Sequence, residues 1–374
     1  MDKIVCKRCV MDNVSDPTIT FNQEGFCNYC TDAIRRMSNT YFPNSEGYRI
    51  LEGLISRLKK DGKGKQFDCI MGLSGGLDSS YLAYLGAVKW GLRILALHID
   101  DGFDTPIAKE NIQMLCKKAN IELKTIIPNS LQFNDLSKSF ILAGVPNIAI
   151  PQDNVIFAYI YKEARKTKVK NFLSGGNFAL ESILEQGNTH TAFDVVNIYN
   201  IHKKFGQEAI PEIPLLSLFR KGILNKFILK INTYRPLNYI DYNKEIAIKD
   251  LNKFCNFNYY GSKHLENYFT AFTQLYWFPN KFGVDKRKSH LSSMIVSGQL
   301  TRDEAVIELG KPLYDKIMMN IVIELIKSKL KFSDTEFTEI MNSIPKQHTD
   351  YKTSLFNRLV YKYYFQKSLY VKQK

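Results

Sequence analysis

The sequence contains no long hydrophobic run. Its 374 residues are 45% hydrophobic overall, yet no apolar stretch reaches the roughly 18 residues that a membrane-spanning helix needs. The start, Met1 to Cys6, also lacks the basic-then-apolar order of a secretory signal. We therefore expect a cytoplasmic protein, and its length allows a core that needs no disulfides.

Acidic residues are fewer than basic ones. There are 37 Asp and Glu residues against 51 Lys and Arg residues, which gives a formal net charge of +14. Such an excess indicates either a nucleic-acid partner or a site for polyanionic small molecules, and composition alone does not decide between them. Part of the excess lies in lysine-rich runs at 162–170 and 327–331, which are typical of solvated helix faces.

Cysteine is scarce after the first thirty residues. Four of the seven cysteines form two Cys-x-x-Cys pairs, Cys6 with Cys9 and Cys27 with Cys30, separated by seventeen residues. This spacing is typical of a zinc ribbon, in which four thiolates close a structural tetrahedral site. Two disulfides are the alternative, and a reducing cytoplasm disfavours them. The remaining cysteines are expected to be core residues: Cys69, Cys116 and Cys255.

Two common phosphate-binding motifs are missing, the Walker Gly-Lys-Ser/Thr and the Gly-x-Gly-x-x-Gly of the dinucleotide fold. Instead, residues 71–80 read Met-Gly-Leu-Ser-Gly-Gly-Leu-Asp-Ser-Ser, directly after the apolar run 67–70. Adjacent glycines, serine hydroxyls and the start of a helix together predict a pyrophosphate cradle. The pattern resembles the PP-loop of ATP pyrophosphatases, which split ATP between its α and β phosphates. A serine-rich turn without a ligand is the alternative.

Strand and helix patterns alternate after the cysteine-rich segment. The expected strands are 67–73, 93–99, 122–127 and 171–174, and the expected helices are 79–90, 106–119 and 154–168. These repeats predict an α/β fold with a doubly wound parallel sheet. Ligands of such sheets bind at the carboxyl ends of the strands. The segments 98–101 and 174–177 are therefore expected beside the glycine loop.

We divide the chain into three parts. They are a zinc-ribbon segment at 1–45, a PP-loop ATP pyrophosphatase α/β domain at 46–191, and a mainly helical substrate or partner region at 192–374. From about Ala192 aromatic residues are interspersed with lysines, and the segment 254–260 is rich in aromatics. Such aromatics could stack on RNA bases, but their spacing favours core and interface positions.

Several sequence blocks together resemble one family. They occur in a single order along nearly the whole chain: the two Cys-x-x-Cys pairs, the glycine-serine loop, Ser-Gly-Gly-Asn-Phe-Ala-Leu-Glu-Ser at 174–182, a basic block at 261–293 and Ser-Gly-Gln-Leu-Thr-Arg at 297–302. This combination resembles the N-acetyl sugar amidotransferases, PP-loop enzymes of bacterial surface-glycan synthesis. Members make acetamidino sugars, including derivatives of pseudaminic and legionaminic acids on flagella and of an acetamido mannuronic acid in the O-antigen of lipopolysaccharide.

The resemblance implies an ATP-dependent carbon–nitrogen ligase that forms AMP. ATP would adenylate the amide oxygen of an N-acetyl group, pyrophosphate would leave, and ammonia would then displace AMP to give an amidine. The implied ligands of the β and γ phosphates are Ser74, Gly75, Gly76, Ser79 and Ser80. Asp78 would place Mg²⁺ or orient the loop.

The same resemblance assigns further residues to the nucleotide and the substrate. Adenine would be bordered by Leu97, His98 and Ile99, although a packed core histidine is an equal alternative for His98. A second edge of the nucleotide or substrate would be formed by Gly175, Gly176, Asn177 and Glu181. The acidic residues that could contact a metal or the sugar, unranked by the sequence, are Asp100, Asp101, Asp104 and Asp153.

Basic residues in the 261–293 block are candidates for stabilising charge. Lys286 and Arg287 are suited to neutralise the α-phosphate or the leaving pyrophosphate. Lys263 and His264 could act in the same way, and a solvated basic turn is the alternative for the group. An acidic or nucleotide-linked sugar would suit a basic cleft.

The sequence lacks the cysteine nucleophile of a built-in glutaminase. The chain begins Met1-Asp2, Cys6 belongs to the zinc pattern, and there is no Gly-x-Cys-x-Gly elbow. Ammonia is therefore expected from a separate glutaminase. The resemblance suggests a partner pair like the glutaminase and cyclase subunits of histidine biosynthesis, which pass ammonia through a channel.

Two other functions stay open. A tRNA-modifying PP-loop enzyme, of the thiolation or lysidine synthetase type, would explain the positive charge more directly. Thiolation enzymes usually carry catalytic cysteines, however, and no convincing pair remains here. A non-catalytic module that binds nucleotide and zinc is the third hypothesis, and the intact Ser-Gly-Gly-Leu-Asp-Ser-Ser argues against it.

Overall fold

A five-stranded parallel sheet forms the centre of the computed structural model, which describes residues 2–261 and 265–360. The strands are β1 (Cys69–Gly72), β2 (Ile94–Ile99), β3 (Glu122–Ile126), β4 (Asn171–Leu173) and β5 (Asn232–Tyr234). Their order is β3-β2-β1-β4-β5, and every neighbouring pair is parallel. The order reverses between β1 and β4, which makes their carboxyl ends the topological switch point. The predicted parallel α/β fold is confirmed.

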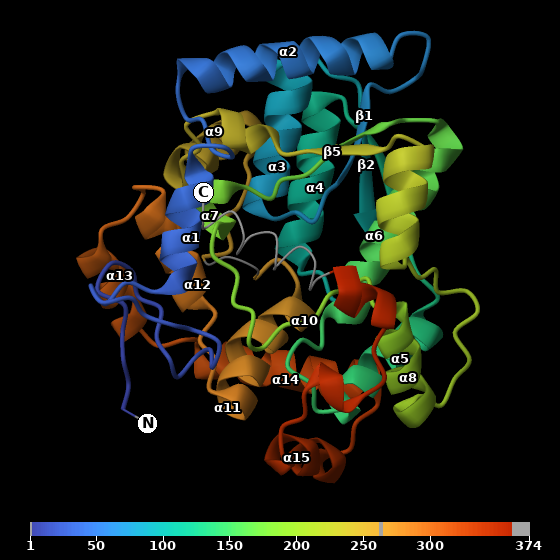
Figure 1. Ribbon diagram of the computed structural model, residues 1–374. Coiled ribbons are helices and arrows are strands. Elements are labelled where there is room, and N and C mark those ends of the chain that lie inside the picture. Colours follow the sequence, from blue (N-terminus) through green and yellow to red (C-terminus); the bar gives the residue numbers. More distant parts are fainter. Residues whose placement is uncertain (1, 262–264, 361–374) are drawn as a thin grey trace.

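Helices surround the sheet (Figure 1). The α-helices are α1 (Asn28–Met37), α2 (Ser45–Asp61), α3 (Leu77–Tyr84), α4 (Pro106–Ala119), α5 (Ser130–Leu142), α6 (Ile150–Thr167), α7 (Phe178–Glu181), α8 (Val195–Phe205), α9 (Lys244–Cys255), α10 (Tyr268–Ala271), α11 (Phe278–Phe282), α12 (Arg287–Val296), α13 (Arg302–Gly310), α14 (Lys316–Leu330) and α15 (Asp334–Asn342). Short π or 3-10 segments are η1 (Leu85–Lys89), η2 (Arg220–Ile228), η3 (Pro236–Tyr239), η4 (Phe272–Trp277) and η5 (His348–Asp350).

Both faces of the sheet are covered, as the alternation of side chains along each strand requires. Met71 of β1 and Ala96 of β2 are buried in one cluster with Leu82 of α3 and Leu115 of α4. The neighbouring residues along each strand point to the opposite face of the sheet and pack with α6. Their cluster contains Ile70, Leu95, Leu97, Phe172, Ala158 and Tyr161. Figure 1 shows α3 and α4 on one side of the strands and α6 on the other.

Local signals explain how well each element could be predicted. Helix α4 has the predicted bounds because Thr105 caps its start, Pro106 occupies its first turn and Asn120 ends it in the left-handed conformation. Strand β5 was not expected. It has only three residues, so it shows no periodicity, and it lies after residue 191.

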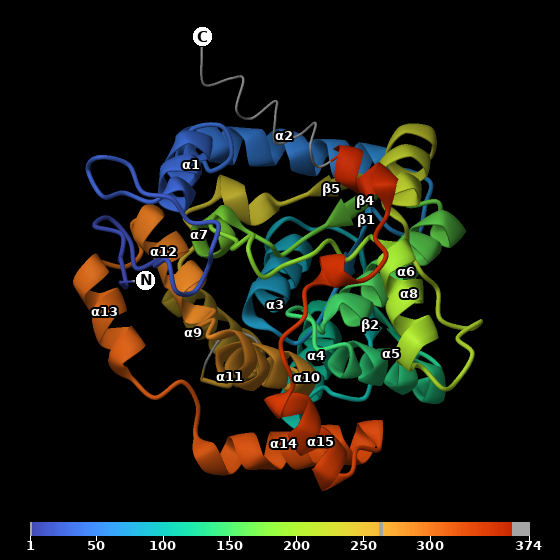
Figure 2. The same cartoon turned by 60° about the horizontal axis from the view of Figure 1, so that its bottom comes forward.

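The C-terminal region forms a second core. Buried side chains of α5, α8, α10, α14 and α15 meet around Trp277 and Phe272. Figure 2 shows α14 and α15 running along the side of the molecule away from α2. In the described part of the chain, we find no helix long and apolar enough to cross a membrane.

The cysteine-rich segment packs against α12 and α13. The Val10 amide donates to Ser292 Oγ at 3.2 Å, and the Lys288 ammonium binds Asp12 at 2.6 Å. Arg302 of α13 donates to the carbonyls of Cys6 and Cys9. This segment is therefore held to the second half of the basic block and to α13, which follows that block.

A substitution at Gly75 tests whether the loop after β1 requires glycine at this position. Its φ is +76°, and an added Cβ would lie 2.5 Å from the Ala108 carbonyl oxygen. We predict that Gly75→Ala lowers the free energy of unfolding by about 1–2 kcal/mol from its φ alone, with the clash adding to this. Gly53→Ala is the matched control, because nothing lies within 4 Å of the added carbon, and it should stabilise α2 by about 0.5–1 kcal/mol. Urea unfolding measures both, and equal stability of the two variants would contradict the prediction.

Candidate active site and cysteine cluster

The loop after β1 forms a compact turn with internal hydrogen bonds. Ser74 Oγ accepts a hydrogen bond from the Gly76 amide at 3.2 Å and lies 3.2 Å from Ser79 Oγ. Gly76 is the N-cap of α3 and has no side chain to cap the helix. A helix start without a side-chain cap suits the binding of an anion.

A second glycine loop, after β4, lies directly against the first. A Cβ on Gly175 would be 3.0 Å from the Ser79 amide nitrogen and 3.1 Å from the Asp78 carbonyl carbon. Only glycine allows the two backbones to approach so closely. Because β1 and β4 are neighbours, both loops lie at the switch point, where ligands of doubly wound sheets bind.

Asp78 is held by a tyrosine that the sequence analysis missed. Tyr242 Oη donates to Asp78 Oδ1. Burial, together with the neighbouring Asp78 carboxylate, raises the pKa of Tyr242 well above its usual value, so the phenol stays protonated and can donate. Tyr260 accepts from the Leu77 amide at 3.1 Å. Tyr259 and Tyr260, expected at core and interface positions, pack against the main core cluster and also line a cavity beside the loop.

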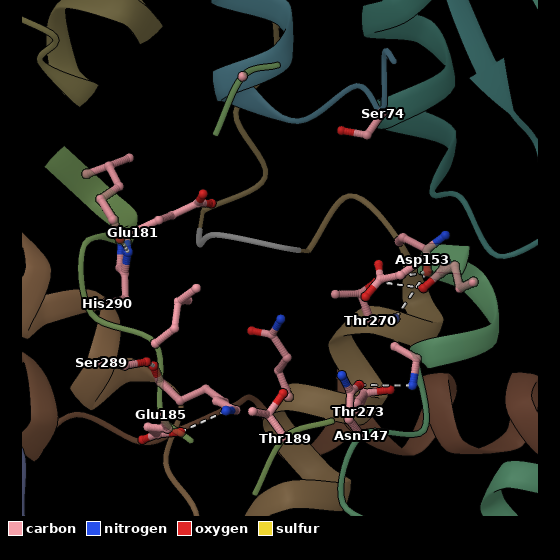
Figure 3. Close-up of a pocket in the computed structure, with 18 of the residues that line it drawn as sticks. Ser74, Asn147, Asp153, Glu181, Glu185, Thr189, Thr270, Thr273, Ser289 and His290 are labelled. Carbon is pink, nitrogen blue, oxygen red and sulfur yellow. Dashed lines mark hydrogen bonds and ion pairs between the residues drawn. The ribbon is translucent and has the colours of Figure 1, made fainter. Parts of the chain in front are cut away.

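Two cavities meet at the loops. The small cavity, about 190 Å³, is lined by Ser74, Gly76, Asp78, Ser79, Gly175, Gly176 and Glu181. The large cavity, about 1770 Å³, shares Ser74, Gly175 and Glu181 with it and extends to Lys286, Arg287 and Ser289. Figure 3 shows Ser74 and Glu185 far apart across the large cavity, with Glu181 and His290 along one side. The loop after β1 and the basic residues Lys286 and Arg287, which were predicted to act together, thus line one cavity.

Lys286 is fixed at the far end of the large cavity by an ion pair. Its ammonium lies 2.7 Å from Glu185 Oε2 and 4.6 Å from the centre of the Phe278 ring. Burial raises the pKa of Glu185, and the positive charge of Lys286 opposes that rise. Glu185 Oε1 is buried without a hydrogen-bond partner among the described residues. The pair therefore places an ammonium group at the cavity, held by a buried carboxylate.

Arg287 has a largely structural set of contacts. Its guanidinium binds the Asp285 carboxylate at 2.8 Å and donates to the carbonyls of Glu308 and Lys311 at the end of α13. Although Arg287 lines the large cavity, its donors are already engaged. Lys263 and His264 lie outside the described residues, so their predicted role stays a prediction.

Other predicted residues divide between the cavity and the interior. Leu97, His98 and Ile99 line the large cavity, as do Asp101, Asp104 and Asp153. Ser80 is fully buried and lines neither cavity, so its hydroxyl does not face the space beside the loop. Asn177 is also buried, and its side chain caps α7 through the Leu180 amide at 3.0 Å. The expected basic cleft is not seen, because carboxylates outnumber Lys and Arg among the described residues that line the large cavity.

The four N-terminal cysteines converge. Cys6 and Cys30 have their sulfur atoms 3.7 Å apart, and Cys9 and Cys27 have theirs 3.6 Å apart. All four are fully buried. Sulfur atoms bound to one tetrahedral zinc ion, at about 2.3 Å each, are roughly 3.8 Å apart. The residues therefore fit a four-thiolate metal site, which is consistent with a zinc ribbon.

The cysteine-rich segment also reaches the active-site region through Asp16. Its buried carboxylate accepts hydrogen bonds from the amides of Gln186 and Gly187 and from Tyr29 Oη. These amides directly follow Glu185. No short motif marks Asp16 or Glu185, which explains why sequence reasoning missed them.

The C-terminal part of the chain matches a known protein family. Residues 266–365 match the family described as "LPS biosynthesis protein WbpG-like, C-terminal domain". This WbpG-like region contains Lys286, Ser289 and His290, which line the large cavity together with Ser74. With the glycine loop, it supports an ATP-using enzyme.

Further comparisons found a relative in sequence and several solved structures. A glutamine-hydrolysing GMP synthase from Elusimicrobium minutum is 30% identical over 183 residues, which are 46% of this chain and 33% of that protein. The chain thus spans about a third of that relative's length. An NMN synthetase structure from Francisella tularensis has a TM-score of 0.34 at 17% identity, covering 78% of this chain and 98% of that one. A U34-tRNA thiolase from Methanococcus maripaludis with its [4Fe-4S] cluster has a TM-score of 0.32 at 14% identity, with coverages of 80% and 88%.

Removing one thiolate tests the cysteine cluster. We predict that Cys27→Ser loses the bound metal and lowers the free energy of unfolding, because a four-thiolate site contributes directly to folding. Metal content by mass spectrometry and urea unfolding measure the two effects.

Cys116→Ser is the matched control, since Cys116 is buried outside the cluster. It should keep the full metal content. Retention of one metal ion per chain in Cys27→Ser would contradict the assignment.

Proposed function

We propose that the protein converts the N-acetyl group of a bacterial surface-glycan sugar to an acetamidino group, using ATP and ammonia and releasing AMP and pyrophosphate. One observation carries the proposal. The region that matches a lipopolysaccharide-biosynthesis family lines the same cavity as the pyrophosphate-type loop after β1. An ATP site and a glycan-related region therefore share one space.

The proposed reaction has two steps. The amide oxygen attacks the α-phosphorus of ATP, the bond to the β-phosphate breaks, and pyrophosphate leaves. Ammonia then adds to the imidate carbon and loses a proton, and the carbon–oxygen bond breaks to release AMP. The activation is needed because an acetamide is a poor electrophile, whereas AMP is a good leaving group.

The chain's own residues support the first step through charge. The loop after β1 and the start of α3 would bind the phosphates, and Asp78 would help to hold the Mg²⁺ that accompanies ATP. Its carboxylate is oriented by Tyr242 Oη. Lys286, anchored by Glu185 and Phe278, would stabilise negative charge that develops during adenylation.

Ammonia is proposed to come from a separate glutaminase, with a channel subunit of the cyclase type as a further partner. Cys69, Cys116 and Cys255 are all buried. Burial raises the pKa of each of these thiols, to about 12 for Cys116. They are therefore poor nucleophiles for glutamine hydrolysis or for the thiolation alternative. We propose zinc as the structural metal of the four-cysteine cluster.

The reaction is tested by incubating the full chain with ATP, Mg²⁺, an ammonium salt and candidate N-acetyl sugars. We expect AMP and pyrophosphate as the nucleotide products, and mass spectrometry should show replacement of the acetamide oxygen by NH. Formation of ADP and phosphate, or no sugar product with any candidate, would contradict the proposal.

Two variants test the roles of the loop and the ion pair. Asp78→Asn and Lys286→Ala should each slow pyrophosphate release by about 10²–10³-fold with the fold retained, the effect expected when one group that stabilises transition-state charge is lost. Lys249→Ala, an exposed lysine of α9 outside both cavities, is the control and should leave the rate unchanged. Normal turnover by both site variants would refute the assignment.

A further inference from the structure

A buried cluster beneath the loop after β1 carries polar atoms that its surroundings do not satisfy. His98 ends β2, and Asp104 follows it in the turn before α4. Their side chains are 7% and 6% exposed. Neither His98 Nε2 nor Asp104 Oδ2 has a hydrogen-bond partner among the described residues. A buried polar atom without a hydrogen bond lowers the stability of the fold, so two such atoms in one cluster suggest that a ligand binds there.

The two unsatisfied atoms face each other. His98 Nε2 lies 3.4 Å from Asp104 Oδ2. That separation is long for a hydrogen bond to a carboxyl group. It equals the roughly 3.4 Å expected between two ligands that each lie about 2.1 Å from a tetrahedral ion.

Hydrogen bonds on the far side of each group point His98 Nε2 and Asp104 Oδ2 toward each other. His98 Nδ1 lies 3.1 Å from the Leu73 carbonyl oxygen. A carbonyl only accepts, so Nδ1 carries the proton and Nε2 presents a lone pair, as in most metal-binding histidines. Asn267 Nδ2 donates to Asp104 Oδ1 at 3.1 Å. This contact leaves Oδ2 to face His98.

A third ligand completes the cluster. One carboxylate oxygen of Asp100 lies within 4.8 Å of the ligand atoms of His98 and Asp104. Asp100 binds Lys109 at 2.7 Å, but the side chain of that lysine is 41% exposed and can turn into solvent.

We propose that His98, Asp104 and Asp100 bind a divalent cation, of the Mn²⁺ or Zn²⁺ class, separate from the ion that accompanies ATP. One imidazole and two carboxylates suit these ions better than Mg²⁺, which prefers oxygen ligands alone. His98, Asp101 and Asp104 line the large cavity, which gives the ion an entry path.

The ion would connect the nucleotide loop to the WbpG-like region. Leu73, which accepts from His98, directly precedes Ser74 of the loop. Asp104 pairs with Asn267 in an isolated β-bridge, and the Thr105 amide donates to the Glu266 carbonyl at 2.9 Å. A bound cation would therefore hold the loop and the start of this region in one arrangement.

The test uses Mn²⁺ alone, added to the full chain without nucleotide and followed by the electron paramagnetic resonance signal of free Mn²⁺. Thiolates bind this hard ion weakly, so the cysteine cluster does not interfere. We expect one bound Mn²⁺ per chain, with its Kd raised at least about tenfold in Asp104→Asn and in His98→Gln. In Asp104→Asn the new amide can donate to His98 Nε2, so the fold should be kept, and circular dichroism checks this.

Asp303→Asn is the control, because Asp303 is exposed on α13 and lies outside both cavities and the cluster. Its Kd for Mn²⁺ should equal that of the wild type. Absence of Mn²⁺ binding by the wild type would overturn the proposal. An unchanged Kd in both the Asp104 and His98 variants, with the fold intact, would overturn it as well.

Discussion

The close approach of two backbones at the end of the sheet is the constraint on which the site depends. The loop after β4 lies against the start of α3 so tightly that a Cβ on Gly175 would be 3.0 Å from the Ser79 nitrogen. This contact exists because β1 and β4 are adjacent and parallel. It brings the loop after β4 against the first turn of α3, which contains Asp78. The cavities, the tyrosines and the distant ion pair are arranged around that point.

The cysteine cluster acts on the site from a distance. Four buried sulfurs in metal-binding geometry shape a segment whose Asp16 accepts the amides of Gln186 and Gly187. Glu185 precedes those amides and anchors Lys286 at 2.7 Å. A structural metal, with no coordination position open to a substrate, can thus help to position Lys286 in the large cavity. This connection also explains how a cysteine segment at the start of the chain and a basic block near residue 286 serve one site.

The sequence was sufficient wherever the signal is local. The strands β1 to β4, helix α4 and the convergence of the four cysteines follow from periodicity, caps and spacing. Strand β5 was missed because three residues carry no period. The inward direction of the Ser80 side chain could not be predicted, because a motif does not say which hydroxyl turns inward. Tyr242, Glu185 and Asp16 act through contacts between residues far apart in the chain, which a single sequence does not reveal.

Labelled oxygen tests the central claim most directly, namely that the loop after β1 presents the α-phosphate of ATP to an amide oxygen. An N-acetyl sugar whose acetamide oxygen carries a heavy isotope is turned over with ATP and ammonia, and the nucleotide products are analysed by mass spectrometry. The account predicts that the label appears in the phosphate of AMP. Label in inorganic phosphate, or AMP that carries no label, would contradict it.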